Sequence, residues 1–286
     1  MKILFKIIIS IFIVGCLTSA TSLRPFIYTV TVKINDTLNI DEREVDVQAW
    51  LSYYTWLQEN EVDLVSRRAL PDSNAMEPIV WQLIKNKSTR MNKEVSLFTY
   101  QYIGNYDADT YESIVKLQKN KQQPSFNQIM MYPMTGLSYE QVIDFCEWRT
   151  EIVGEKKVEY RLPTENEWTM IAKLGLKSNE KSQGFCDSLD GKKLLFNYKT
   201  LNSSRYKYKE SIPISNLQSA ANFLPNELKI WDLFGNVSEM TSKKGIAKGG
   251  SFNSFAKQCN VDSIQHYKRP EKWLGFRCVA ILLPQE

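Results

Sequence analysis

The chain has 286 residues, of which 43% are hydrophobic and 24% charged, a composition typical of a water-soluble globular protein with one large domain or two ordinary ones. Its formal net charge is +4 and no dense basic run occurs, which argues against nucleic acid as a partner. His266 is the only histidine, and this excludes sites that need several imidazole ligands, such as facial iron triads and most zinc hydrolase centres.

The amino terminus has the layout of a secretory signal, since two lysines precede an apolar run from Ile7 to Val14. The run is shorter than the roughly 20 apolar residues of a membrane-spanning helix. Residues 13–16 resemble a bacterial lipobox, in which Cys16 carries the lipid, whereas residues 18–20 would suit an ordinary signal peptidase. We favour the lipobox because Cys16 directly follows a small residue at the end of the apolar run. Residues 1–22 are therefore expected to export the protein and to anchor it, as an outer-membrane lipoprotein, to the periplasmic side of a bacterial membrane.

Export also changes how the other cysteines are interpreted. Without Cys16, four remain in a compartment that permits disulfides, namely Cys146, Cys186, Cys259 and Cys278. Four cysteines allow three pairings, and their spacing alone does not choose among them.

No internal repeat, low-complexity tract or long linker follows the signal, so residues 23–286 are predicted to form a single domain. Residues 28–40 alternate loosely between apolar and polar side chains and predict a strand. Residues 47–57 place apolar side chains at helical spacing, which predicts an amphipathic helix whose aromatic residues face the core. Residues from about 60 to 130 are polar, charged and weakly periodic, and predict a long excursion with short elements.

Two capping boxes predict the starts of two further helices, one at Ser138 and the other at Thr164. Apolar side chains follow each box at helical spacing, and Gly175 is a stop signal for the second helix. The last third of the chain is rich in turns and short apolar pieces, and it ends in a predicted strand over residues 278–283. Helices early and short strands late indicate an α+β fold rather than alternating βαβ units.

Five segments in chain order carry a resemblance to a known family. They are residues 133–140 (PMTGLSYE), 160–168 (YRLPTENEW), 231–240 (WDLFGNVSEM), 248–252 (KGGSF) and 274–278 (LGFRC). The chain resembles the formylglycine-generating-enzyme, or sulfatase-modifying-factor, superfamily over most of residues 38–283. The resemblance implies a compact, irregular α+β domain related to C-type lectins, with short strands and few helices.

The resemblance also implies a disulfide. Family members pair a cysteine of the first helix in this part of the chain with the cysteine that follows Gly-Phe-Arg. Here these residues are Cys146 and Cys278, so a bond between them is expected, and two buried free thiols are the alternative.

A calcium site is a further implication of the resemblance. The asparagine turn of family enzymes contributes side-chain and backbone oxygens, which suit this hard cation. Asn236 and Glu239 keep the oxygen-bearing side chains and Val237 offers its carbonyl. Lys229, however, stands where the family commonly has glycine. Calcium is therefore one expectation and a purely hydrogen-bonded turn is the other.

Catalytic members of the family oxidise a substrate cysteine with oxygen and with copper held by two cysteines, since soft thiolates stabilise Cu(I). That pair stands three and eight residues after the serine of the Gly-Gly-Ser motif, which here is Ser251, so the two positions hold Ser254 and Cys259. A serine hydroxyl is neither soft nor readily ionised. Copper is therefore not expected, and no catalytic residue is assigned in this vestigial pocket.

Three functions are consistent with these residues. The first is a non-catalytic, lipid-anchored envelope protein that contacts other envelope proteins of a membrane-attached complex, and residues 146–150 resemble the gliding-motility and type nine secretion lipoproteins of the superfamily. The second is an oxidoreductase of the family type with an altered active site, in which Cys259 acts beside Ser254, although a structural role for Cys259 is the simpler interpretation. The third is carbohydrate or peptide binding through the lectin-like surface.

Overall fold

The structure is a computed structural model and describes residues 30–61, 68–89, 126–153, 157–177, 189–190, 193–194, 196–199, 217–223 and 225–284. Its elements are short strands and few helices, which confirms the predicted α+β class. The predicted signal and lipobox lie outside the described residues, as does Cys186. Among the helices that are described, none is both long enough and apolar enough to cross a membrane.

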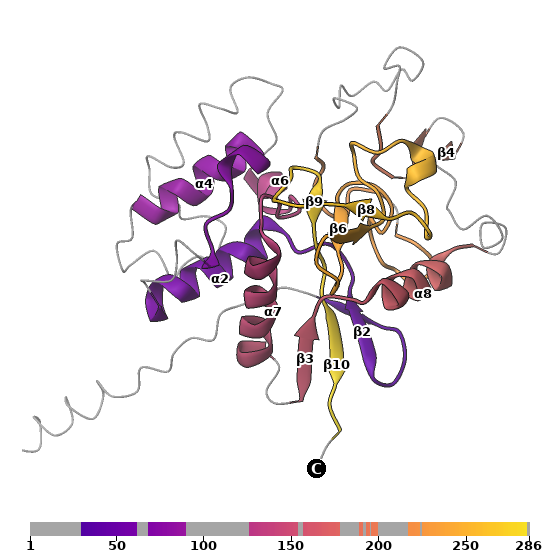
Figure 1. Cartoon of the computed structure of the whole chain (residues 1–286), viewed down its shortest axis with the longest axis horizontal. Coiled ribbons are helices and arrows are strands. Elements are labelled where there is room, and N and C mark those ends of the chain that lie inside the picture. The colour runs from indigo at the N-terminus through magenta and orange to yellow at the C-terminus, as the bar shows by residue number, and fades with distance from the viewer. Residues whose placement is uncertain are drawn as a thin grey trace, which may run out of the picture.

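Two predicted helices begin where local signals place them, and they lie on the left of Figure 1. Helix α2 (Val47–Asn60) starts after Asp46, whose side chain accepts a hydrogen bond from the first turn. Helix α7 (Tyr139–Val153) starts with the predicted capping box, in which Ser138 and Gln141 exchange hydrogen bonds of 3.0 and 3.2 Å. Both capping arrangements satisfy backbone N–H groups that the helix itself leaves unpaired.

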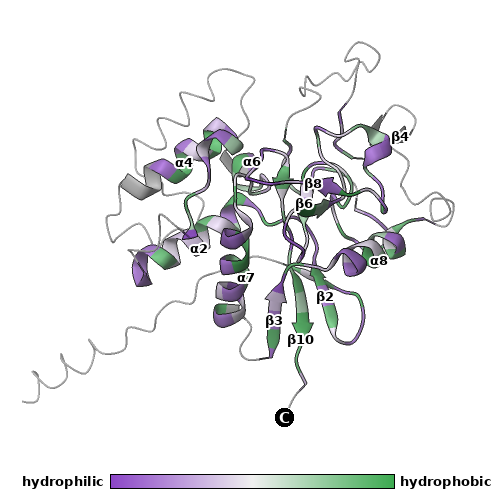
Figure 2. Cartoon of the chain, in the orientation of Figure 1, coloured by the Kyte–Doolittle hydropathy of each residue, from purple (hydrophilic) through white to green (hydrophobic). Residues whose placement is uncertain are grey.

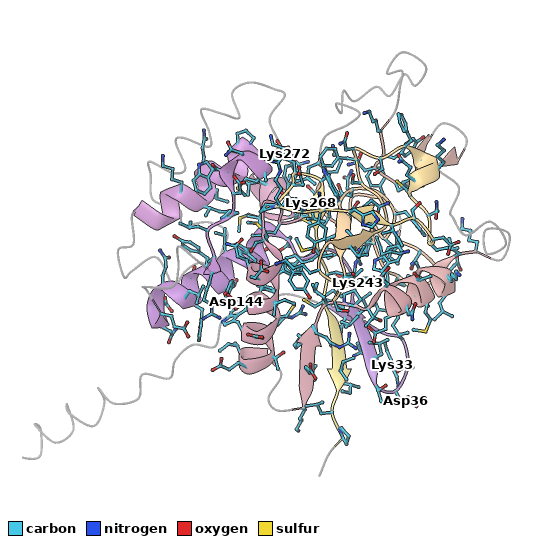
Figure 3. The ribbon with its side chains drawn as sticks, in the orientation of Figure 1. Lys33, Asp36, Asp144, Lys243, Lys268 and Lys272 are labelled. Carbon is cyan, nitrogen blue, oxygen red and sulfur yellow. The ribbon has the colours of Figure 1, made fainter. Side chains whose placement is uncertain are left out.

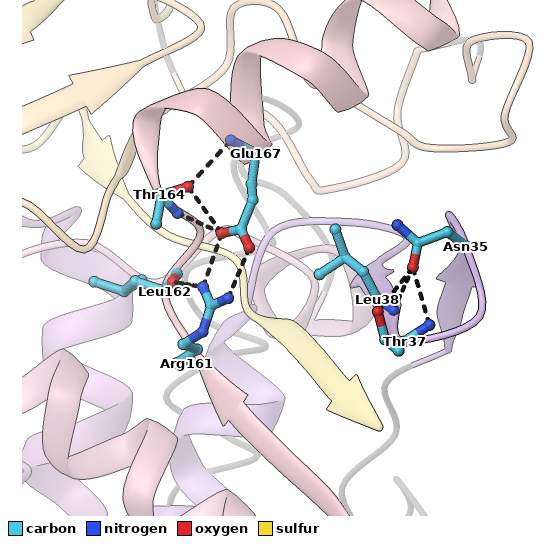
Figure 4. A network of polar contacts seen from close by, with 7 residues as sticks. All are labelled: Asn35, Thr37, Leu38, Arg161, Leu162, Thr164 and Glu167. Atoms are coloured by element: carbon cyan, nitrogen blue, oxygen red, sulfur yellow. Dashed lines mark hydrogen bonds and ion pairs between the residues drawn. The ribbon is translucent and has the colours of Figure 1, made fainter. Parts of the chain in front are cut away.

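Helix α8 (Glu165–Gly175) confirms the second capping box (Figure 4). The Glu167 carboxylate accepts from the backbone N–H of Thr164 at 2.8 Å, and the Thr164 hydroxyl accepts from the Glu167 N–H at 3.1 Å. Arg161 donates two further bonds of 2.7 and 2.8 Å to the same carboxylate. The segment that carries the family motif therefore fixes both the start of α8 and its angle to the preceding strand.

Short helices stand in the described parts of the predicted excursion. Helix α4 (Pro78–Thr89) occupies this stretch, and its Val80, Leu83 and Ile84 are buried in the core. The stretch ends in helix α6 (Phe126–Met130). The sequence did not locate α4, because its three buried side chains lie within little more than one turn. Residues 62–67 and 90–125 of the excursion lie outside the described residues. Two short 3-10 helices, η2 and η3, cover Ser73–Ala75 and Ala256–Gln258.

The first sheet brings the two ends of the domain together. Its strand order is β1-β2-β10-β3, and every neighbouring pair is antiparallel. The carboxyl-terminal strand β10 fills the middle, with Val279 opposite both Ile40 and Arg161. The strands are β1 (Thr31–Lys33), β2 (Leu38–Asp41), β3 (Val158–Arg161) and β10 (Val279–Leu282). The predicted terminal strand is thereby confirmed.

The single strand predicted over residues 28–40 is instead a hairpin. The Asn35 side-chain oxygen accepts from the backbone N–H groups of Thr37 and Leu38, each at 2.9 Å, and closes the turn between β1 and β2 (Figure 4). An Asn side chain that bonds two residues ahead favours a turn over a continuing strand.

The second sheet has the order β8-β7-β6-β9, with β6 and β9 parallel and the other pairs antiparallel. Its strands are β6 (Ser238–Met240), β7 (Ile246–Lys248), β8 (Gln265–His266) and β9 (Leu274–Gly275). A separate ribbon pairs β4 (Leu189–Asp190) with β5 (Lys193–Leu194). The second sheet carries three of the five family motifs, so it positions the candidate site.

Two buried clusters form the core. The first is aromatic and lies between α2, α7 and the carboxyl-terminal segment, with neighbouring ring centroids 5.1 to 6.4 Å apart; its rings are Trp50, Tyr53, Phe145, Trp148 and Phe276. The second surrounds the inner face of α8, where the predicted Trp168, Ile171 and Ala172 are buried. Figure 2 shows β10 as largely hydrophobic and α8 as mixed, which fits a central strand and a half-exposed helix.

Candidate functional site

Asn236 is the centre of the turn over residues 231–240. Its side chain is fully buried and its backbone φ is 53°, a left-handed value that asparagine tolerates better than most residues. Its oxygen accepts from Asn197 Nδ2 at 3.2 Å and from the Gln218 N–H at 3.1 Å. Its nitrogen donates to Glu44 Oε1 and to the Gln218 carbonyl, each at 3.2 Å. One amide group therefore ties the turn to three distant segments of the chain.

Glu239 lies three residues further on, in β6, and is also fully buried. Its Oε1 accepts from Arg277 Nε at 2.7 Å, and its Oε2 accepts from Trp168 Nε1 at 2.7 Å. Burial raises the pKa of the Glu239 carboxyl, while the Arg277 guanidinium opposes that rise. These contacts join the asparagine turn, the Gly-Phe-Arg motif and α8 in one buried ion pair.

Two of the three residues expected to bind calcium are held by hydrogen bonds within the protein, and calcium stays a prediction. Both Glu239 oxygens and the Asn236 oxygen already accept protein hydrogen bonds, and Val237 offers no more than a carbonyl. Within the residues that the structure describes, no three His, Cys, Asp or Glu side chains gather as metal ligands. Lys229 adopts a φ of 66°, the region that glycine favours, so the turn keeps its family shape without glycine. The arrangement is that of a hydrogen-bonded turn.

Sequence reasoning missed two buried carboxyls beside this turn, Glu44 and Asp232. Asp232 Oδ2 accepts from the Ala221 N–H at 2.7 Å, whereas its Oδ1 has no partner in the described part of the chain. Burial raises the pKa of Asp232 to about 6. Burial and, after it, the Asp232 charge hold the pKa of Glu44 well above its ordinary value.

A second buried ion pair lies beneath the first sheet. Arg149 donates two bonds of 2.8 Å to the two oxygens of Asp41, and the Cys278 N–H donates to the same carboxylate at 2.9 Å. The Arg149 guanidinium also lies 4.0 Å from the centre of the Tyr160 ring. Arg149 is fully buried, and the ion pair explains how its charge is accommodated there.

The same region brings Cys146 and Cys278 together. Their sulfur atoms are 3.6 Å apart and both side chains are buried free thiols in this structure. That distance is a thiol contact, since a disulfide bond is about 2.05 Å long. Cys146 and Cys278 are therefore close together, as the family resemblance implies. The covalent bond between them stays a prediction.

The two vestigial copper positions, Ser254 and Cys259, both contact the turn after the glycines. The Ser254 hydroxyl lies 3.1 Å from the Ser251 N–H and 3.3 Å from the Ser251 hydroxyl, so it closes the turn after the glycines. Cys259 is fully buried and its thiol donates to the Phe255 carbonyl at 3.7 Å. A Cβ at Gly250, whose φ is 72°, would lie 2.6 Å from the Cys259 sulfur. Cys259 therefore packs against the glycine turn.

The surroundings of Cys259 also disfavour reactivity. Burial raises the pKa of its thiol to about 12, although backbone N–H groups of Ser251 and Gly235 oppose the rise. The thiolate is the reactive and copper-binding form of cysteine, and it is scarce at neutral pH when the pKa is this high. The site can therefore hold the turn in place, but it lacks the chemistry of a nucleophile.

We expect Cys259 to resist alkylation in the folded protein. Iodoacetamide treatment followed by peptide mass spectrometry should leave Cys259 unlabelled at neutral pH and label it fully after denaturation. Ser254→Cys is the matched control, because position 254 is half-exposed and its new thiol should react in the folded state. Rapid labelling of Cys259 in the native protein would restore the altered-enzyme interpretation.

Comparison with known proteins places the chain in a family. A family model described as a sulfatase-modifying factor enzyme 1-like domain matches residues 29–282. No curated protein sequence matches the chain significantly. Among solved structures, the crystal structure of CarF is similar with a TM-score of 0.52 and 15% identity, over 91% of this chain and 95% of that one. At this identity the likeness shows the fold alone.

Two further solved structures are similar over comparable lengths. The structure of PvdO from Pseudomonas aeruginosa has a TM-score of 0.49 and 14% identity, over 89% of this chain and 91% of that one. Treponema denticola variable protein 1 has a TM-score of 0.44 and 15% identity, over 89% of this chain and 92% of that one. With the family model covering nearly the whole domain, the chain belongs to the sulfatase-modifying factor enzyme 1-like family.

Proposed function

We propose that this protein is a non-catalytic, lipid-anchored envelope protein that uses its sulfatase-modifying-factor-like domain for contacts with other proteins. The observation that carries the proposal is the pair of positions Ser254 and Cys259. One of the two soft ligands for copper is a hydroxyl, and the other is a buried thiol packed on a glycine turn. The fold is retained while the donor set of the family chemistry is incomplete.

Anchoring and location belong to the same proposal. Lipidation of Cys16 would hold the domain at the periplasmic side of the outer membrane through the short segment before residue 30. The assembly it joins would be one of gliding motility or type nine protein secretion, and the support for that choice is the resemblance of residues 146–150 to lipoproteins of that branch.

An oxidoreductase with an altered site is the competing function. It would need Cys259 as a thiolate that substrate can reach, whereas the side chain is fully buried and its pKa is raised to about 12. These two observations favour a structural cysteine.

Restoring the missing ligand gives a direct test of the pocket. We expect Ser254→Cys to raise the affinity for Cu(I) by at least about tenfold, because a second soft sulfur ligand replaces a hydroxyl. Competition with a chromogenic Cu(I) chelator measures the change, and Ser263→Cys, a serine outside the pocket, is the control. If Ser254→Cys and Ser263→Cys bind Cu(I) equally, positions 254 and 259 are not the family's copper pair.

The proposed role in an assembly is tested in native membranes. The full-length, carboxyl-terminally tagged protein is extracted in mild detergent and captured, and its partners are quantified by mass spectrometry. A stoichiometric set of envelope proteins supports the proposal and names the assembly. Recovery of the protein alone, or with a single client trapped through a cysteine, would overturn it. Cys16→Ala provides the control for anchoring, since it should release the protein from the membrane fraction.

A further inference from the structure

Strand β8 lies at the edge of the second sheet, because the strand order begins with it and β7 is its only neighbour among the described strands. The N–H of Tyr267 bonds to the Gly245 carbonyl at 3.1 Å, and Ile246 faces His266 across the pair. In an antiparallel ladder, bonded and non-bonded pairs alternate. The backbone N–H and C=O of His266 therefore point away from β7.

Ile264 and Lys268 lie two residues to either side of His266, just outside the two-residue strand. Neither makes a backbone hydrogen bond within the described part of the chain. All three side chains are exposed, and Ile264 is 46% exposed, whereas Tyr267 between them is buried. Residues 264–268 thus combine the outward-facing backbone groups of His266 with one exposed apolar and two polar side chains. We call this segment the β8 edge.

The charge beside the β8 edge is positive. Lys268 belongs to it, and Lys257 lies in η3, which Gln265 contacts through the Gln258 carbonyl at 3.4 Å. Neither lysine forms an ion pair with any residue that the structure describes. The nearby acids are already engaged, since Asp262 lies 3.7 Å from Lys173 and Glu271 lies 3.2 Å from Arg269. Figure 3 labels Lys268 and Lys272 beside the second sheet.

This charge decides what can cover the edge. Lysine on an edge strand discourages pairing between identical copies, because the positive side chains would face one another. An incoming strand with acidic side chains is attracted instead. Its backbone groups can bond to the edge while its carboxylates approach the lysines. A second copy of this chain is therefore disfavoured, and a partner of opposite charge is favoured.

We propose that the β8 edge binds an extended acidic segment of a partner protein by strand addition. The proposal rests on the proposed function, since it names the surface through which the domain contacts another protein. Alternate residues of the segment would face His266 and Lys268 with carboxylates, and an apolar residue would cover Ile264.

His266 offers a variant that separates backbone from side chain. Because its N–H faces away from β7, His266→Pro removes an edge donor without removing a bond of the existing sheet. His266→Ala removes the same side chain and keeps the donor, so it is the matched control. Lys268→Glu reverses the charge and leaves the backbone unchanged.

The probe is a synthetic peptide of about six residues with glutamate at the two positions that would face His266 and Lys268, and with valine elsewhere, including the position that would face Ile264. Its affinity for the intact protein is measured by fluorescence anisotropy, beside a lysine–valine peptide of equal length. We expect the glutamate peptide to bind wild type and His266→Ala, and to bind His266→Pro about fivefold more weakly, as the loss of one backbone hydrogen bond implies. Lys268→Glu should shift the preference toward the lysine peptide. If His266→Pro does not fold, the peptide can be changed instead. N-methylation of alternate peptide residues removes the backbone donors that would bond to the β8 edge, and it should weaken binding.

Three results would overturn the proposal: no binding by the wild type, equal binding by His266→Pro and His266→Ala, or no preference between the two peptides. Capture from native membranes distinguishes it from the wider function. Partners recovered with His266→Ala and lost with His266→Pro support the β8 edge. Partners recovered equally with both mean that the domain contacts proteins elsewhere. If the wild-type protein captures no partners at all, the proposed role in an assembly is rejected. The peptide measurement still tests the β8 edge separately.

Discussion

Replacing Arg277 with methionine should lower the free energy of unfolding by about 3–5 kcal/mol, because it leaves the Glu239 carboxylate buried without its partner. The guanidinium also donates to the carbonyls of Asp41 at 3.2 Å and Trp231 at 2.9 Å, and both acceptors would lose that bond. Urea unfolding followed by tryptophan fluorescence at neutral pH measures the loss. An effect of this size is a large share of the roughly 5–15 kcal/mol by which native proteins are ordinarily stable.

Two controls decide whether the cause is the unpaired charge. Adding Glu239→Gln to Arg277→Met should recover part of the stability, because a neutral amide is less costly to bury and can still accept from Trp168. Lys33→Met breaks an exposed ion pair with Asp36 and should change stability by less than about 0.5 kcal/mol (Figure 3). A loss below about 1 kcal/mol in Arg277→Met would show that Glu239 is solvated in solution.

Local signals explain which elements the sequence predicts. Capping residues mark the helices that begin at Tyr139 and Glu165, and they lie within three positions of each start. The starts of these helices can therefore be predicted from nearby side chains alone. The hairpin at residues 31–41 was mistaken for one strand because the decisive feature is a side-chain bond of Asn35 rather than the apolar pattern. Helix α4 was not located because its buried side chains, Val80, Leu83 and Ile84, lie within little more than one turn and give no sustained periodicity.

The candidate site depends on partners that lie far apart in the chain. The motif residue Glu239 was identified, but its role is set by Arg277, 38 residues away, and by Trp168, 71 residues away. Asn236 bonds to Glu44 across 192 residues, which no local pattern can announce. The family resemblance predicted that the motifs belong to one domain. It did not predict which charged side chains pair inside that domain.

Stability should fall as the pH rises from about 4 to 7. Burial raises the pKa of Asp232 from 3.8 to about 6 and holds the pKa of Glu44 well above its ordinary value, so the stabilisation by these protonated groups is fully present only below their unfolded-state pKa. It is lost as the pH climbs through the folded-state pKa, and Asp46, whose pKa is also raised to about 6, adds to the loss. The decline should be on the order of a few kcal/mol, measured by urea unfolding at intervals across this range.

Two further measurements complete the test: the acidic side of the pH–stability profile and a variant that cannot ionise at position 232. Arg161 holds the pKa of Glu167 at about 2, so stability from that contact is lost as the pH falls below about 4.5, and the maximum should lie near pH 4. Asp232→Asn keeps an acceptor for the Ala221 N–H and suits the φ of 52°, yet it cannot ionise. Its profile between pH 4 and 7 should therefore be flatter than that of the wild type. If both profiles decline equally, Asp232 is not the group that titrates, and if neither declines, water reaches the carboxyls that the fold buries around Asn236.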